Sequence, residues 1–168
     1  MPTKSTTASG RCCWHAAWAS AASSPKPEPG TPELPGALDF ARYLRQKDIL
    51  VAISHTEAEY DAIKAAYEAG FTHAAHFYNA MPGFHKRREY KYEGTVESVY
   101  LTDGMTIELI ADGIHLPATI LKLAYKLKGV ERTCLVTDAM SCSASNGKEI
   151  NDPRYIIEEA GRPLVPGR

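Results

Sequence analysis

Histidine and aspartate side chains recur in this sequence at or just after the ends of four short apolar segments. In chain order these residues are His55, His76, Asp112 with His115, and Asp138. Neutral imidazoles suit borderline divalent ions such as zinc and iron. A carboxylate beside such an ion can act as a general base toward a water molecule whose acidity the ion has raised. These residue types therefore indicate metal-dependent hydrolysis.

Each of these residues also has a purely structural interpretation. His55 could serve only at the entry to the next helix, although Thr56 already fills that role. Asp138 could be only a helix N-cap, and His115 could be a surface side chain next to Pro117. A histidine or aspartate lies at or just after the end of each of the four predicted strands. This favours the catalytic interpretation, because the parallel strands of an α/β barrel present their catalytic residues at one rim.

His73 and His76 are close neighbours near the end of one predicted strand. Side chains three residues apart on a strand point to opposite faces, so only one of the two can face a barrel interior. His76 lies nearer the rim, and we expect it to bind metal while His73 is structural. His55 and His76 then supply two ligands, and a third must come from elsewhere.

A long basic and aromatic loop is predicted over residues 78–97, and it contains the run His-Lys-Arg-Arg-Glu-Tyr-Lys-Tyr, which starts at His85. A run of charge is often only a solvated surface. Its position near the same rim also fits a phosphate or carboxylate site, in which arginine is the better bidentate partner. RNA binding is disfavoured, because the segment is short and has no companion basic patch.

The elements that must position these residues alternate between helical and strand patterns. The spacing Thr56–Glu59 predicts a capping box that opens a helix ending at Gly70. Alternating strands and helices predict an α/β fold of parallel strands with helices outside. The predicted strands are 48–53, 72–77, 106–111 and 132–137. One helix is predicted from its apolar stripe at Leu38, Ala41 and Leu44, a second follows Thr56, and a third spans 117–128.

Composition limits the partners of the chain. Its 168 residues are 44% hydrophobic, which is enough for one domain with a core, and 19 basic against 20 acidic residues give a net charge of −1. This balance gives no general attraction to nucleic acid or to an anionic membrane. No apolar run approaches the roughly 18 residues of a membrane span. The four cysteines match no zinc spacing, and thiols in a reducing cytoplasm are expected.

Three regions are expected along the chain. Residues 1–30 are rich in small residues and proline, which predicts a disordered or foreign segment. Residues 31–142 are predicted to form a partial barrel, and residues 143–168 are predicted to form an irregular tail. A closed eight-fold barrel needs about 250 residues, and roughly 200 at least. The length therefore predicts about half a barrel.

Over about residues 31–142 the sequence resembles N-acetylglucosamine-6-phosphate deacetylases of the amidohydrolase superfamily. The blocks His-Phe-Tyr-Asn-Ala-Met, from His76, and Ala-Asp-Gly-Ile-His, ending at His115, are highly specific in this order and spacing. The other matching segments are Thr31–Gly36, Ile53–Thr56 and Leu135–Met140. The resemblance implies a metal-dependent hydrolase with a TIM-type (β/α)8 barrel, of which this chain would be roughly the second half.

The resemblance also implies roles for individual residues. His55 and His76 would bind one divalent ion, zinc or iron, together with a Glu from an upstream segment that this sequence does not contain. Asp138 would activate the attacking water and then protonate the leaving amine. Glucosamine 6-phosphate and acetate would be the products.

Further residues would bind the phosphosugar substrate. Asn79 and Ala80 would contact the sugar phosphate, Arg87 would clamp it, and His115 would contact the substrate around its N-acetyl group. The family has Arg-Glu-Pro-Gly after the basic loop, whereas this chain has Arg-Arg-Glu-Tyr, so the clamp is Arg87 or Arg88.

The resemblance implies a cytoplasmic enzyme that is a homodimer when complete. A chain without one of three metal ligands is expected to bind metal weakly, and it could be inactive alone. Two other interpretations stay open at this point. One is a different amidohydrolase, such as a dihydroorotase-like or amino-acid deacetylase enzyme, and the other is a non-catalytic binding or assembly fragment.

Overall fold

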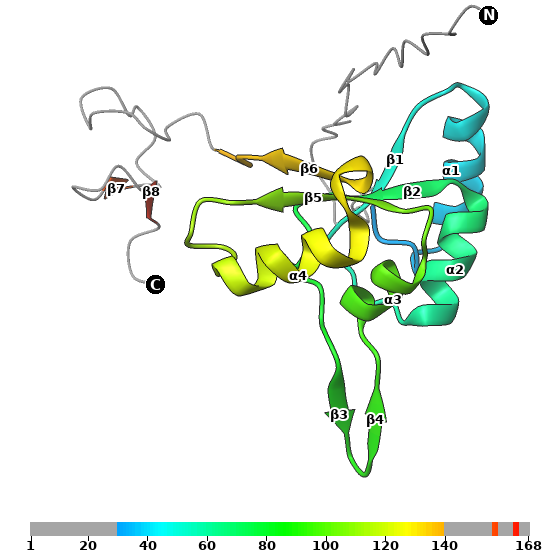
Figure 1. Ribbon diagram of the computed structural model, residues 1–168. Helices are drawn as coiled ribbons and strands as arrows, with labels where there is room; N and C mark the ends of the chain where they lie inside the picture. The colour runs from blue at the N-terminus through cyan, green and yellow to red at the C-terminus, as the bar shows by residue number, and fades with distance from the viewer. Residues whose placement is uncertain (1–29, 140–155, 158–162, 165–168) are drawn as a thin grey trace, which may run out of the picture.

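The computed structural model describes residues 30–139, 156–157 and 163–164 (Figure 1). The segment predicted over residues 1–30 lies outside the described residues except for Gly30. Within the predicted tail, the structure describes two short strands, β7 (Ile156–Ile157) and β8 (Pro163–Leu164), which pair antiparallel; the rest lies outside the described residues.

Four parallel strands form the main sheet, in the order β1-β2-β5-β6. Their bounds are β1 Val51–Ile53, β2 Phe71–Ala74, β5 Thr106–Ile110 and β6 Thr133–Val136. The segments between successive strands of the sheet contain helices, as crossover connections between parallel strands require. The predicted alternation of parallel strands and helices is therefore confirmed, although each strand is shorter than predicted.

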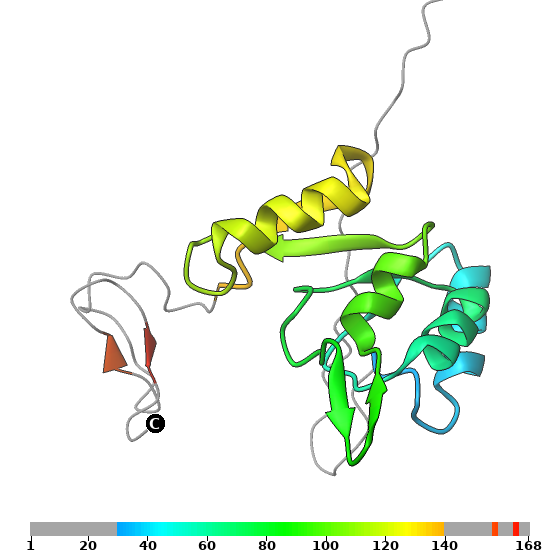
Figure 2. The same cartoon turned by 60° about the horizontal axis from the view of Figure 1, so that its bottom comes forward.

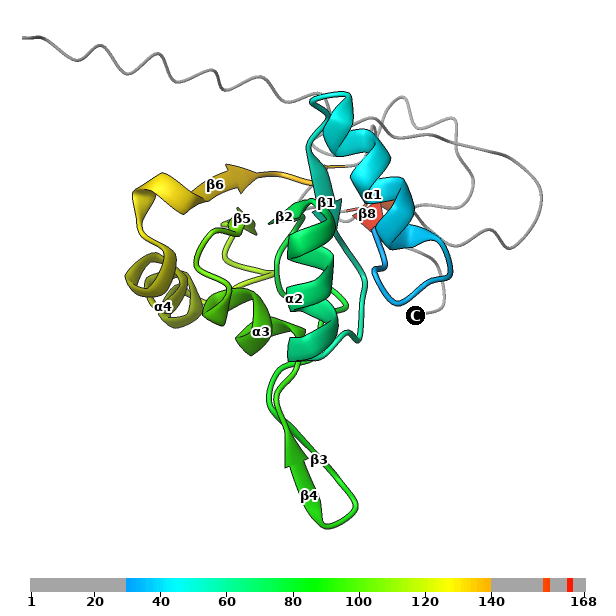
Figure 3. The same ribbon diagram turned by 90° about the vertical axis from the view of Figure 1, so that its right-hand side faces the viewer.

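Helices cover the sheet along one side, as Figure 3 shows. The first, α1 (Ala37–Gln46), buries Ala41 and packs Leu38 and Leu44 against the core, which confirms the predicted apolar stripe. The last, α4 (Ala118–Lys128), lies alongside β5 and β6 (Figure 2). Among the described residues, no helix has the length and hydropathy that crossing a bilayer requires.

The predicted capping box at Thr56 is wrong, because α2 (Tyr60–Ala69) begins later. Its N-cap residue, Glu59, has an extended backbone and makes no side-chain capping hydrogen bond. The buried Thr56 hydroxyl lies 2.6 and 2.7 Å from the two carboxylate oxygens of Glu33, and it accepts the N–H of Ala58. Thr56 therefore ties the segment before α1 to the loop after β1. The predicted stop of α2 at Gly70 is confirmed, where φ is 125°.

The segment predicted as a long loop over residues 78–97 contains a two-stranded hairpin and the first turn of a helix. An antiparallel hairpin of β3 (His85–Arg87) and β4 (Tyr90–Tyr92) projects away from the rest of the fold (Figures 1 and 3). Helix α3 (Thr95–Leu101) follows at once. The carboxylate of Glu97 accepts the N–H of Gly94 at 2.9 Å, which is half of a capping box.

The core lies between the sheet and the helices. Its largest fully buried side chains include Ile53, Ile63, Phe71, Phe77 and Ile107. The edge strand β6 is less covered, since its Leu135 is 73% exposed. The apolar core thus surrounds β1, β2 and β5, and thins toward β6.

Lys128 is a buried cation at the end of α4. Its side chain is 2% exposed, and Nζ donates a hydrogen bond to the carbonyl oxygen of Thr102 at 2.8 Å. Burial lowers the pKa of Lys128 to about 8, with the charge of Arg132 acting in the same direction and Asp103 opposing it.

We predict that Lys128→Met removes a pH-dependent part of the stability. Because the folded chain disfavours the charged amine, the unfolded chain binds more protons between the folded pKa of about 8 and the ordinary value of 10.5. The free energy of unfolding of the wild type should therefore rise with pH across this window relative to that of the variant. Urea denaturation at pH 7.5, 9 and 10 measures the difference. The exposed Lys126→Met is the matched control, and parallel pH curves for wild type and Lys128→Met contradict the prediction.

Candidate metal centre

The rings of His55 and His76 lie side by side beyond the neighbouring strands β1 and β2. Their centroids are 4.6 Å apart and their planes differ by 20°. Nδ1 of His76 is buried and has no hydrogen-bond partner among the described residues. Two imidazoles that share one zinc ion each place a nitrogen about 2.0–2.1 Å from it, so ligand rings must be near neighbours. The pair has the proximity, and the uncommitted nitrogen, that the predicted ligands require.

The predicted residues share a backbone conformation as well as a position. His55, His76 and Asp138 each lie two residues past the end of a strand, and their φ angles are 44°, 33° and 48°. Few non-glycine residues adopt this left-handed region, although histidine and aspartate do so more readily than most. Such residues cluster at functional sites, where the surrounding structure holds them. Three strands therefore end in a left-handed kink at a residue singled out by its chemistry.

The carboxylate of Glu108, on β5, contacts both histidines of the β2 segment. Its Oε2 accepts the main-chain N–H of His76 at 3.1 Å, and its Oε1 lies 3.1 Å from Nε2 of the buried His73. Burial raises the pKa of Glu108, but the contact with His73 and the hydrogen bond from His76 outweigh burial and hold the pKa below its ordinary value. The carboxylate is therefore ionised at neutral pH.

Glu108 was missed as a functional residue when the sequence was considered alone. The available signal was a single acidic residue inside the strand segment Thr106–Ile110, which is otherwise mostly apolar. A partly buried carboxylate inside a strand is expected to have a partner. The sequence does not say which residue that partner is, because the partner lies on another strand.

The structure does not gather His55, His76 and Asp138 into one ligand group. Among the residues that the structure describes, one group of three possible ligands has all its ligand atoms within 4.8 Å of one another, and it is His73, Glu108 and Cys134. The predicted histidine pair is thus brought together without the aspartate.

Strand register sets where the ends of the four strands lie relative to one another. Ile53 pairs with Ala74, so β1 and β2 end level, and Ile110 pairs with Val136, so β5 and β6 also end level. Between these two pairs, however, Ala74 is the partner of Ile107, three residues before the end of β5. At about 3.3 Å per residue the two pairs of strand ends are staggered by roughly 10 Å. Asp138 follows β6, so it belongs to the pair of strands, β5 and β6, whose ends extend farther along the sheet.

Asp112 and His115 form a compact turn beyond β5. Nδ1 of His115 lies 2.7 Å from Oδ2 of Asp112, whose Oδ1 accepts the N–H groups of Ile114 and His115. Gly113, at φ 78°, lies within this turn. The imidazole is exposed, and its contact with Asp112 orients it.

The residues predicted to bind phosphate lie in two places, the turn after His76 and the hairpin of β3 and β4. Asn79 belongs to the turn after His76 and donates its N–H to the His76 carbonyl oxygen at 3.0 Å, and Ala80 follows at φ 48°. Arg87, on β3, forms an ion pair with Glu59 and lies over the ring of Tyr92, 3.9 Å from its centroid. The guanidinium thus already holds one carboxylate, which is a group that a phosphate can replace.

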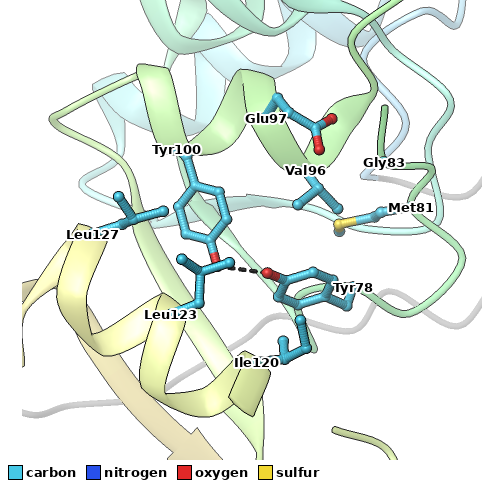
Figure 4. A pocket seen from close by; sticks show the side chains of 9 residues that line it. All are labelled: Tyr78, Met81, Gly83, Val96, Glu97, Tyr100, Ile120, Leu123 and Leu127. Carbon is cyan, nitrogen blue, oxygen red and sulfur yellow. Dashed lines mark hydrogen bonds between the residues drawn. The ribbon is translucent and has the colours of Figure 1, made fainter. Parts of the chain in front are cut away.

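A separate apolar hollow of about 370 Å³ lies between α3 and α4 (Figure 4). It is lined by Met81, Val96 and Ile120, among others, and by the hydroxyl-linked pair Tyr78 and Tyr100, whose oxygens are 2.7 Å apart. Burial raises the pKa of both tyrosines. None of the predicted site residues lines this hollow.

We predict that the Asp112 carboxyl titrates with a midpoint near pH 2. The main-chain N–H groups of His115 and Ile114 lower its pKa to about 2 from 3.8, and the His115 side chain adds a smaller effect. A lowered pKa means that the hydrogen-bonded turn persists above pH 3.8 and is lost as the pH falls through about 2. In His115→Phe the midpoint should rise only in part, because the main-chain donors remain. Carboxyl ¹³C chemical shifts measure both midpoints, and a wild-type midpoint near 3.8 contradicts the prediction.

No family model matches the sequence. N-acetylglucosamine-6-phosphate deacetylase of Vibrio furnissii is 39% identical over 128 residues, which are 76% of this chain and 30% of that protein. N-acetylgalactosamine-6-phosphate deacetylase of Escherichia coli O157:H7 is 36% identical over 127 residues, 75% of this chain and 31% of that protein. This chain therefore spans about a third of the length of the curated relatives it matches.

Solved structures of deacetylases with the same name also resemble this fold. A structure of a mutant N-acetyl-D-glucosamine-6-phosphate deacetylase from Mycobacterium smegmatis, in complex with N-acetyl-D-glucosamine-6-phosphate, matches with a TM-score of 0.71 and 32% identity over 82% of this chain and 35% of that one. The predicted α/β class is confirmed, and the parallel sheet corresponds to part of the TIM-type barrel of these enzymes. The chain is thus homologous over part of its length, in sequence and in structure, to the N-acetylglucosamine-6-phosphate deacetylases.

Proposed function

We propose that this chain carries metal-binding and acid–base residues of a hydrolase that deacetylates N-acetylglucosamine 6-phosphate. The observation that carries the proposal is the adjacent ring pair of His55 and His76, each on a left-handed backbone beyond neighbouring parallel strands. The homology supports the reaction class, and the Mycobacterium smegmatis complex supports the substrate class.

The chemistry divides between the ion and the aspartate. A divalent ion at the histidine pair would polarise the amide carbonyl and raise the acidity of a water molecule. Asp138 would accept a proton from the attacking water and deliver it to the leaving amine, so that acetate and glucosamine 6-phosphate are released. This role requires Asp138 to come within hydrogen-bond reach both of the water at the histidine pair and of the amide nitrogen of the substrate.

The substrate would meet the chain through its exposed features. His115, held by Asp112, would donate to the N-acetyl group, while Asn79 and Ala80 would contact the phosphate. Arg87 would exchange its partner Glu59 for the phosphate, since both present oxygens to the same guanidinium edge. The curated relative from Escherichia coli O157:H7 is named for the galactose epimer of this sugar, so N-acetylgalactosamine 6-phosphate is the second candidate substrate.

We predict that the chain binds Co²⁺ through His55 and His76. Either single substitution, His55→Ala or His76→Ala, leaves one imidazole of the pair and should lower the Co²⁺ affinity at least tenfold. Titration of the full chain, followed by visible absorption of the bound ion, measures the affinity. His85→Ala, on the projecting hairpin, is the matched control. Equal affinity in all four proteins contradicts the assignment of the pair as ligands.

We predict that Asp138→Asn abolishes most of any acetate release from N-acetylglucosamine 6-phosphate. An amide in place of the carboxylate cannot accept the proton, and general-base catalysis typically contributes a factor of about 10²–10⁴. Acetate is measured with Zn²⁺ or Fe²⁺ present, using both epimeric sugars, and the exposed Asp103→Asn is the control. Equal rates in the wild type and Asp138→Asn contradict the role of Asp138. No acetate from the wild type contradicts hydrolase activity of this chain by itself.

A further inference from the structure

We propose that Glu108 is a positioning residue, which holds the main chain of His76 so that its ring lies beside that of His55. This inference rests on the proposed function in one respect, namely that His76 is a metal ligand. The contact itself is independent of that function, because it joins a side chain on β5 to a main-chain N–H group beyond β2.

The chain beyond β2 is held by three successive N–H groups. The N–H of Ala75 donates to the carbonyl oxygen of Ile53, at 2.9 Å, on one neighbouring strand. The N–H of Phe77 donates to the carbonyl oxygen of Glu108, also at 2.9 Å, on the other. Between them, the N–H of His76 donates to the carboxylate of Glu108 at 3.1 Å. Glu108 therefore holds two consecutive residues, one through its main chain and one through its side chain.

This arrangement compensates the backbone geometry of His76. Successive N–H groups of a regular strand point alternately to the two neighbours, but those of His76 and Phe77 both turn toward β5. The positive φ of His76, 33°, produces that turn and is an unfavourable conformation for a residue with a side chain. A hydrogen bond to an ionised carboxylate is stronger than one to a neutral acceptor, so Glu108 is suited to stabilise the kink.

His73 fixes the carboxylate in turn. Its side chain is 1% exposed, with Nε2 3.1 Å from Oε1 of Glu108 and Nδ1 2.6 Å from the hydroxyl oxygen of Thr106. The Thr106 hydroxyl also lies 3.3 Å from the carbonyl oxygen of Thr72. The carboxylate therefore meets a buried imidazole on one oxygen and the His76 main chain on the other.

The same cluster has the residue types of a metal site, since Cys134 joins His73 and Glu108 within 4.8 Å. Each member, however, has a partner within the protein. Both oxygens of Glu108 are engaged as described, and Sγ of Cys134 donates to the carbonyl oxygen of Ile107 at 3.3 Å. The contacts thus favour a positioning network, and Cys134 offers a variant that separates the two interpretations.

Hydrogen exchange tests the contact without any metal. In Glu108→Ala the His76 amide should exchange at least tenfold faster than in the wild type, while the amides of Ala75 and Phe77 stay within about twofold, because their acceptors are main-chain oxygens. Glu108→Gln, which keeps an acceptor oxygen, should restore most of the protection. Unchanged exchange at His76, or equal loss at all three amides, overturns the proposal.

A measurement on the wild type covers the case in which Glu108→Ala does not fold. The His76 ¹⁵N nucleus and the Glu108 carboxyl ¹³C nucleus should show a scalar coupling through their hydrogen bond. Absence of this coupling at pH 7, with couplings across the main-chain bond of Phe77 detected in the same sample, overturns the proposal.

Co²⁺ titration then tests the consequence. Loss of a residue that orients a metal-binding histidine typically weakens affinity about 10–100-fold, so Glu108→Ala should show such a loss, Glu108→Gln a loss of at most about threefold, and Cys134→Ala none. Wild-type affinity in Glu108→Ala, with weakened binding in His76→Ala, overturns the positioning role. An equal loss in Cys134→Ala also overturns it, because the ion would then occupy the cluster. Unchanged binding in His76→Ala contradicts the proposed function instead and leaves the exchange result to decide the contact.

Discussion

Parallel pairing between β2 and β5 is the constraint on which the candidate site depends. It joins the level ends of β1 and β2, which carry the histidine pair, to the level ends of β5 and β6, which carry Asp112 and Asp138. The register of this one pairing sets the stagger between the two groups. A slip along β5 would alter the distance between the proposed ion and the proposed base, and it would also remove Glu108 from the His76 main chain. The positions of the proposed ligand His76, the proposed base Asp138 and the positioning residue Glu108 therefore all depend on the register of this pairing.

Much of the architecture was accessible from local sequence patterns, because the relevant signals are short. Apolar runs located the four strands, Gly70 marked the end of α2, and the reactive residues followed the strands as expected. Features that depend on distant partners were not accessible. Thr56 has the sequence pattern of a helix cap, yet its hydroxyl donates a hydrogen bond to the carboxylate of Glu33, which lies 23 residues earlier in the chain. In the sequence alone Glu108 is an isolated charge, because its partners His73 and His76 belong to the neighbouring β2 segment.

Helix α3 was missed for a different reason. The cue, Glu97 three residues after Gly94, was present in the sequence, but the basic run before it dominated the interpretation of the whole segment. Spatial grouping was the other limit. Sequence order predicted that His55, His76 and Asp138 share a rim, and each lies two residues past the end of a strand. How far apart these strand ends lie depends on strand register, which no local pattern encodes.

The hairpin of β3 and β4 differs from the rest of the fold in what holds it. Among its described contacts with the body, the ion pair of Arg87 with Glu59 joins two side chains that are both open to solvent. Exposed charge pairs weaken as dissolved ions shield them, over a distance of about 8 Å at physiological ionic strength. The sheet, held by main-chain hydrogen bonds and buried side chains, has no comparable sensitivity. Salt concentration should therefore change the tilt of this arm while the framework beneath it keeps its shape.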